Sequence, residues 1–220
     1  MNRVLVIAVH PDDETLGCGG TLLRHKAEGD EIYWLIVTTN DKKYSAERNA
    51  HRDQMVRKAS ELYNFDGVFE AGFPTTCLDT LDVNSLVEQI NNVYNTVKPN
   101  VIYMNFINDV HSDHKAAFDA AYTCTRSFRK PFIKKIYMME ALSETEFAPA
   151  VSASSFCPNV FVDITDYIDK KLEIMSIYDT EMMKEPFPRS LSSIKALARV
   201  RGSRAGVMYA EAFQLLYERI

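Results

Sequence analysis

The chain has 220 residues, of which 46% are hydrophobic and 25% are charged, and its formal net charge is −5. These proportions are typical of a globular protein with a substantial core, and they exclude a disordered chain. The negative charge argues against broad binding of nucleic acid, which needs many Lys and Arg side chains on one face. No apolar run approaches the roughly 20 residues of a membrane helix. We therefore expect a single cytoplasmic domain over residues 1–220.

Strand and helix patterns alternate along the chain. Residues 4–9 are a continuous apolar run, typical of a strand buried on both faces of a parallel sheet. Residues 21–27 have a helical pattern that ends at Gly29. Hydrophobic spacing predicts further strands at 32–37, 67–70, 101–104, 133–139 and 160–163, and further helices at 47–63, 83–97, 116–126, 167–178 and from 190 onward. Residues 143–158 are predicted to form a loop.

This order of elements predicts the α/β class. We expect a Rossmann-like, doubly wound, mostly parallel sheet with helices on both faces and an elaborated C-terminal third. In such sheets, ligands bind outside the carboxyl ends of the strands, at the crevice where the strand order reverses. With the common order 3-2-1-4-5, this crevice lies between the first and fourth strands.

Ionisable side chains follow both of the strands that flank this crevice. Residues 10–14 (HPDDE) follow the first strand, and residues 111–114 (HSDH) follow the fourth. The topology alone therefore brings the two motifs together. Ser112 is suited to cap the helix that follows, which would place His111 and His114 near its first turn.

Two imidazoles and two or three carboxylates in one crevice are suited to a divalent transition metal with an open position for water. We expect Zn²⁺, although Fe²⁺ or another divalent transition metal fits the same donors. Such a metal lowers the pKa of bound water to about 7 and polarises a carbonyl group. The remaining carboxylate and histidine are then available for proton transfer and transition-state stabilisation. Spacing alone does not say which aspartate binds the metal.

Some of these features also have structural interpretations. Either motif alone is compatible with a capped helix start or a solvated turn. Residues 17–20 (GCGG) resemble a phosphate-binding turn but lack the GxGxxG spacing, and we expect them to allow close helix packing. His25 and His51 fall on predicted helix surfaces, where we expect no catalytic role.

Taken together, the residues resemble the LmbE-like (PIG-L) zinc-dependent N-deacetylases, which remove acetyl groups from N-acetylglucosamine derivatives and related amides. The resemblance covers nearly the whole chain. It rests on the opening strand and on the segments HPDDE (10–14), GCGGTL (17–22), HSDH (111–114), ARVRG (198–202), Gly206 and AEAF (210–213).

The resemblance implies a role for each motif residue. His10, Asp13 and His114 would bind zinc, and Asp12 would be the general base. His111 would stabilise the oxyanion, with Asp113 orienting its imidazole and favouring the charged form. Arg52 matches an arginine that the family directs toward the substrate, and Arg48 is close enough to compete. The family often has an acidic residue soon after a proline near the third strand, whereas Thr75 and Thr76 follow Pro74 here.

The function implied is hydrolysis of an acetamide on an N-acetylated sugar or sugar conjugate. Zinc-bound water, deprotonated by Asp12, would attack the acetyl carbonyl. One alternative is a zinc amidase that acts on a thiol conjugate or an antibiotic, and another is a non-catalytic Rossmann-like module that binds a sugar or nucleotide. An intact general base argues against the non-catalytic module. The sequence leaves open the identity of the sugar and its aglycone, which we expect loops 41–45 and 143–158 to select. It also leaves open the native metal, the biological pathway and whether the protein forms a homo-oligomer.

Overall fold

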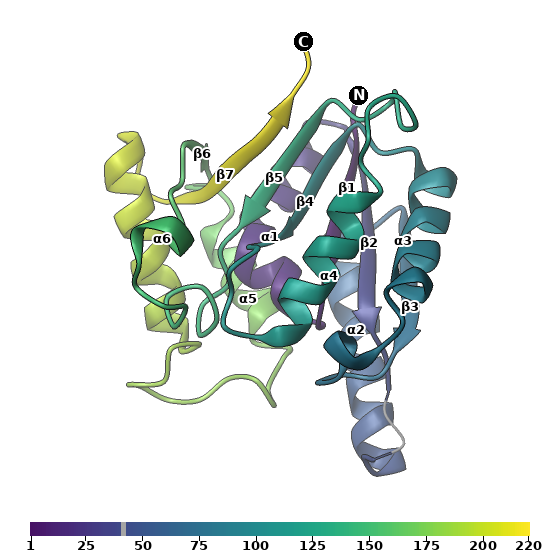
Figure 1. Ribbon diagram of the computed structural model, residues 1–220. Helices are drawn as coiled ribbons and strands as arrows, with labels where there is room; N and C mark the ends of the chain where they lie inside the picture. Colours follow the sequence, from purple (N-terminus) through teal and green to yellow (C-terminus); the bar gives the residue numbers. More distant parts are fainter. Residues whose placement is uncertain (41–42) are drawn as a thin grey trace.

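Seven strands form one sheet in the computed structural model, which describes residues 1–40 and 43–220 (Figure 1). The strands lie in the order β3-β2-β1-β4-β5-β7-β6. Their bounds are β1 (Arg3–Ala8), β2 (Glu31–Thr38), β3 (Gly67–Phe73), β4 (Val101–Asn105), β5 (Lys135–Met139), β6 (Val160–Asp163) and β7 (Ala210–Glu218). The first five are parallel, and β7 runs antiparallel to β5 and β6. The predicted fold class and the order 3-2-1-4-5 are confirmed.

Helices cover both faces of the sheet (Figure 1). They are α1 (Asp13–Ala27), α2 (Ala46–Tyr63), α3 (Val83–Val97), α4 (Ser112–Thr123), α5 (Ile168–Met175) and α6 (Leu191–Ala205), with 3₁₀ turns at Leu78–Thr80 and Ser152–Ser154. Apolar side chains of α3 and α4 form one core with one face of the sheet, and those of α1, α2 and α5 form a second core on the other face. None of the helices in the described part of the chain is long and apolar enough to cross a membrane.

The C-terminal region differs from the prediction of a helix from 190 onward. Helix α6 ends at Ala205, where Gly206 adopts φ 76 and closes it in the left-handed conformation. Residues 210–218 then form strand β7, which is inserted between β5 and β6. The alanines and glutamates at its ends are weak strand formers, so tertiary pairing overrides the local preference.

Helix α1 begins earlier than predicted and is kinked. It starts at Asp13 and runs through the glycine-rich segment, with non-helical φ −143 at Cys18. A Cβ on Gly17 would lie 2.6 Å from the Met139 side chain, and one on Gly20 would lie 2.7 Å from Ile164. The expectation that these glycines allow close packing is therefore confirmed.

Strands β1 and β4 pair in parallel, and this pairing positions the two motifs. Val4 to Ile7 lie opposite Val101 to Met104, so both strands end at the same edge of the sheet. Residues 10–14 lead from β1 into α1, and residues 109–114 lead from β4 into α4. The crevice predicted between the first and fourth strands therefore receives both segments.

Candidate active site

The three predicted metal ligands lie together at this crevice. Donor atoms of His10, Asp13 and His114 are all within 4.8 Å of one another. His114 Nε2 lies 3.3 Å from Asp13 Oδ2, and His10 Nδ1 lies 3.8 Å from the same oxygen. Asp13 and His114 are buried, whereas His10 is partly exposed. The structure thus brings together one carboxylate and two imidazoles from segments about a hundred residues apart.

The surroundings of His114 fit a bound cation. Its Nδ1 is 2.7 Å from Asp109 Oδ2, and its Nε2 is buried without a hydrogen-bond partner among the described residues. If Nδ1 carries the proton toward Asp109, the Nε2 lone pair faces an oxygen of Asp13. Burial lowers the pKa of His114, but Asp13 and Asp109 outweigh it and raise the value to about 10. A divalent cation could replace the proton that these charges attract to Nε2.

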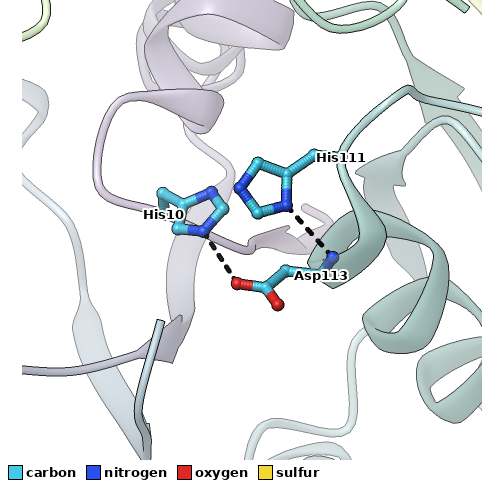
Figure 2. A group of neighbouring side chains, drawn as sticks. All are labelled: His10, His111 and Asp113. Carbon is cyan, nitrogen blue, oxygen red and sulfur yellow. Dashed lines mark hydrogen bonds and ion pairs between the residues drawn. The ribbon is translucent and has the colours of Figure 1, made fainter. Parts of the chain in front are cut away.

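Asp113 contacts His10 through its carboxylate (Figure 2). Its Oδ2 is 3.3 Å from His10 Nε2 and accepts the backbone N–H of Thr76, while Oδ1 accepts that of Leu78. Burial raises the pKa of Asp113, but these hydrogen bonds lower it to about 2. The expectation that this carboxylate orients the His111 ring is therefore corrected, because the carboxylate is directed to His10.

His111 is the N-cap of α4, a position that Ser112 was expected to fill. Its Nδ1 accepts the backbone N–H of Asp113 at 3.1 Å (Figure 2). This bond requires Nδ1 to be unprotonated, so a neutral ring carries its proton on Nε2. Burial lowers the pKa of His111 to about 4, with His10 and His114 acting in the same direction. The charged form expected from the sequence is thus disfavoured, and His111 is suited to donate as a neutral imidazole.

Asp12 is held in an unusual backbone conformation, with φ 133. Its N–H donates to Glu14 Oε2 at 3.0 Å, and its Oδ2 accepts from Arg189 Nη1 at 2.7 Å. Its Oδ1 has no hydrogen-bond partner in the part of the chain that the structure describes. Burial raises the pKa of Asp12 well above its ordinary value, although Arg189 opposes this effect. A raised pKa makes the ionised carboxylate a stronger base, so Asp12 is suited to accept a proton.

A cavity of about 330 Å³ opens beside these residues. Residues of both motifs line it, together with residues of β2 and α2. Arg52 is among the lining residues, and its guanidinium donates to Thr38 O and Glu70. Arg48 also lines the cavity and lies over the Tyr44 ring at 3.9 Å. The lining residues are His10, Pro11, Asp12, Thr38, Thr39, Asn40, Tyr44, Arg48, Asn49, His51, Arg52, Met55, Thr75, His111, Glu144, Thr180, Glu181 and Arg189.

The two loops expected to select the substrate both reach this cavity, through Tyr44 and Glu144. Residues 41 and 42 of the first loop lie outside the described residues. The other two histidines have acidic partners that the sequence analysis did not foresee. His25 contacts Asp30 at 2.8 Å, and His51 contacts Asp179 at 2.7 Å.

Sequence reasoning missed several residues of the site. Asp109 lies two residues before HSDH, and its position before two histidines was a usable signal. Arg189 and Glu181 come from the C-terminal third and Glu144 from the loop after β5, and no spacing connects them to either motif.

Comparisons with known proteins agree with the fold and the motifs. The family model for PIG-L, described as GlcNAc-PI de-N-acetylase, matches residues 5–125, which include both motifs. A diacetylchitobiose deacetylase of Thermococcus kodakarensis is 22% identical over 226 aligned residues, covering 98% of this chain and 84% of that protein.

Solved structures extend the likeness over the full length. The conserved protein TT1542 of Thermus thermophilus superposes with a TM-score of 0.82 at 28% identity, covering 100% of this chain and 97% of that one. The 4-carboxy-2-hydroxymuconate hydratase of Pseudomonas putida gives 0.77 at 18% identity, covering 100% and 98%. The same fold is thus found in a hydratase, so the fold alone does not identify the reaction. The family model matches more than half of the chain, in a segment that includes both motifs, and the chain therefore belongs to the PIG-L family.

Proposed function

We propose that this protein is a zinc-dependent N-deacetylase that hydrolyses the acetamide of an N-acetylglucosamine-type sugar. The observation that carries the proposal is the position of Asp12 beside the cluster of His10, Asp13 and His114. Asp12 is a buried carboxylate, and one of its oxygens has no hydrogen-bond partner among the described residues. A site that only bound a ligand would not need a proton acceptor at this position. The family match and the diacetylchitobiose deacetylase relative support the choice of an N-acetylated sugar.

His10, Asp13 and His114 would hold the metal. When bound, a divalent cation supplies Lewis-acid polarisation of the acetyl carbonyl and lowers the pKa of a water that it binds. Asp109 and Asp113 hold the outward ring nitrogens of His114 and His10, which fixes both imidazoles in orientation.

Asp12 would move the proton in this reaction. Its Oδ1 accepts a proton from the attacking water as the new carbon–oxygen bond forms. The same carboxylic acid then returns the proton to the nitrogen as the carbon–nitrogen bond breaks, which releases the amine and acetate. Because His111 is neutral, Asp12 is the group that we expect to protonate the leaving amine.

His111 would stabilise the charge that develops on the carbonyl oxygen. Its Nδ1 is fixed by the N–H of Asp113, and its ring lines the cavity. The Nε2–H is then the donor available to the oxyanion. Arg52 and Arg48, which also line the cavity, are the cations suited to contact sugar oxygens or the aglycone. We further propose that residues 1–220 act as one domain, since Arg189 from the C-terminal third contacts Asp12.

A panel of N-acetylated substrates tests the proposal. Purified protein with measured zinc content is incubated with N-acetylglucosamine, N,N'-diacetylchitobiose and nucleotide-, inositol- and lipid-linked N-acetylglucosamine, and acetate and free amine are quantified. We expect equimolar acetate and amine from at least one member, loss of both after chelation, and recovery when Zn²⁺ is restored. Zinc-loaded protein that releases neither product from the whole panel contradicts the proposal, and hydration of an unsaturated acid would indicate the hydratase chemistry instead.

A further inference from the structure

Arg189 connects the C-terminal third of the chain to the residues that follow β1. It lies in the segment between α5 and α6, beyond the part that the family model matches. Its Nη1 donates to Asp12 Oδ2 at 2.7 Å. Asp12 is 2% exposed, and this ion pair is shielded from solvent. A charge-assisted hydrogen bond in such surroundings is directional as well as strong.

Other contacts fix the Arg189 guanidinium. Its Nε donates to Ser143 Oγ at 2.7 Å, and its Nη2 donates to Glu144 Oε1 at 3.1 Å. Glu181 lies on the Nη1 side at 3.4 Å. Three of its nitrogens therefore have acceptors. Because the guanidinium is planar, these bonds determine both its position and the plane in which it meets Asp12.

The two oxygens of Asp12 consequently differ. Oδ2 is occupied by Arg189, whereas Oδ1 has no hydrogen-bond partner among the described residues. The backbone N–H of Asp12 is held by Glu14 at 3.0 Å, so the main chain is restrained as well. Since Asp12 lines the cavity, the unpartnered oxygen is the one available to a reactant.

We propose that Arg189 is a positioning residue for the reaction, and that its hydrogen bond to Oδ2 holds Asp12 with Oδ1 directed at the reacting water. The inference rests on the proposed function, in which Asp12 moves the proton. It assigns a role to the C-terminal third, which supplies the group that orients an aspartate of the first motif. Arg189 itself transfers no proton, because a guanidinium stays charged in proteins.

Arg189→Ala tests the proposal. Without the guanidinium, Asp12 can rotate about its side-chain bonds, and misplacement of a reacting group by about 1 Å costs on the order of 10²-fold in rate. We expect kcat to fall by about this factor with KM little changed, because the interaction acts on Asp12 and not on substrate binding. Arg189→Lys keeps the charge but loses the planar fork, and its kcat should be intermediate.

The control is Arg201→Ala. Arg201 lies on α6 and forms a two-point ion pair with Glu140, at 2.8 and 2.6 Å, but it does not line the cavity. Its loss should leave kcat unchanged. Added guanidinium ion, below the concentration that unfolds the protein, should restore part of the kcat of Arg189→Ala and none of any loss in Arg201→Ala. A purely structural role for Arg189 would not give this rescue.

Three kinetic results would overturn the proposal: a higher KM with unchanged kcat, which marks a substrate contact; a higher kcat, which marks an inhibitory contact; and failure of guanidinium to rescue a folded Arg189→Ala protein. A crystallographic comparison separates this inference from the proposed function. If wild-type protein deacetylates nothing, the function fails, and the Asp12 carboxylate should still be displaced or take two orientations in crystals of Arg189→Ala. An Asp12 side chain that keeps its wild-type position in those crystals overturns the positioning role.

Discussion

Each of the two histidines proposed to bind the metal has a carboxylate partner on its other ring nitrogen. Asp109 contacts His114 at 2.7 Å, and Asp113 contacts His10 at 3.3 Å. Such partners fix the tautomer and the ring orientation of a ligand and increase its basicity. Both aspartates lie at the start of α4 or just before it. One short segment of chain therefore carries the proposed ligand His114 together with the carboxylates that contact His114 and His10.

Asp109→Asn should therefore weaken metal binding. An amide can accept the Nδ1–H of His114 but lacks the charge, and loss of such a partner typically costs roughly 10- to 100-fold, so we expect an increase in the zinc dissociation constant of about this size. His114→Ala, which removes the ligand itself, should lower zinc content sharply while leaving the fold largely intact. Competition with a chromophoric chelator measures both variants. Asp119→Asn, on the exposed side of α4, is the control, and wild-type affinity in Asp109→Asn would remove the orienting role.

His111→Ala should lower kcat by about 10²-fold, the loss typical of one oxyanion donor. Since the pKa of His111 is lowered to about 4, the residue is neutral from about pH 5 upward and cannot produce the alkaline limb of a pH–rate profile. The variant should therefore keep the alkaline limb of the wild type when zinc is saturating. Profiles of kcat/KM against pH for the two proteins check this. An alkaline limb that disappears with the imidazole would show that His111 acts in its charged form.

At the residue scale, the sequence predicted which side chains gather but not how they are bonded. His10, Asp13 and His114 could be predicted to converge because strand order delivers their segments to one crevice. The partner of Asp113 could not, because it depends on backbone N–H groups at Thr76 and Leu78 that turn this carboxylate toward His10. The hydrogen bond from Arg189 to Asp12 could not be predicted either, because Arg189 lies far from the motif in sequence.

Helix α1 shows how an element is adapted to the site. Its first turn carries Glu14, which is fully buried and accepts from Thr15, Tyr178 and the N–H of Asp12. After the kink at Cys18, the N–H groups of Gly20 and Thr21 donate to Glu211 of β7. A buried carboxylate thus caps the second half of the helix, and Lys171 at 2.7 Å balances its charge.

Glu14 should make stability depend on pH. Burial raises its pKa to about 7, from an ordinary value of 4.5, despite hydrogen bonds from Thr15 and Tyr178 that lower it. Between these values the folded protein binds more protons at this group than the unfolded chain does, so the free energy of unfolding falls as pH rises. The full decrease in the free energy of unfolding, on the order of 3 kcal/mol, is reached above about pH 7.

Urea unfolding of metal-free protein at several pH values measures this effect. Subtracting the unfolding free energy of Glu14→Gln, which cannot ionise, from that of the wild type isolates Glu14. We expect this difference to fall between about pH 5 and 7 and to be level on either side. Glu88→Gln, an exposed substitution on α3, should give a flat difference. A flat difference for Glu14→Gln would contradict the raised pKa.

Among the elements, those with a strong local pattern were predictable. Strand β1 is apolar after its first residue, and α3 has a regular apolar face, and both follow the predicted ranges closely. Strand β7 was not predictable, because its pairing partners β5 and β6 lie more than forty residues away in sequence. The start of α1 was also missed, since Gly17, Gly19 and Gly20 are poor helix formers whose tight packing appears only in the folded protein.

Over the whole molecule, the site is assembled from both halves of the chain. Strands β1 and β4, within the segment that the family model matches, lead into the proposed metal-binding and proton-transfer groups. The C-terminal third supplies Arg189 to Asp12 and Glu211 to α1. The predicted elaboration at this end of the chain is therefore connected directly to the residues of the first motif.

A paired substitution tests most directly whether this crevice is a metal-dependent deacetylase site. Zinc content and acetate release from the best substrate of the panel are measured for wild type, Asp12→Asn and Asp13→Asn under identical metal loading. We predict that Asp12→Asn keeps zinc at the wild-type level but loses at least about 10²-fold in acetate release, because an amide cannot accept the proton. Asp13→Asn should lose the zinc itself. An Asp12→Asn protein that retains wild-type acetate release, or a pair in which Asp12→Asn loses zinc and Asp13→Asn keeps it, would contradict the account.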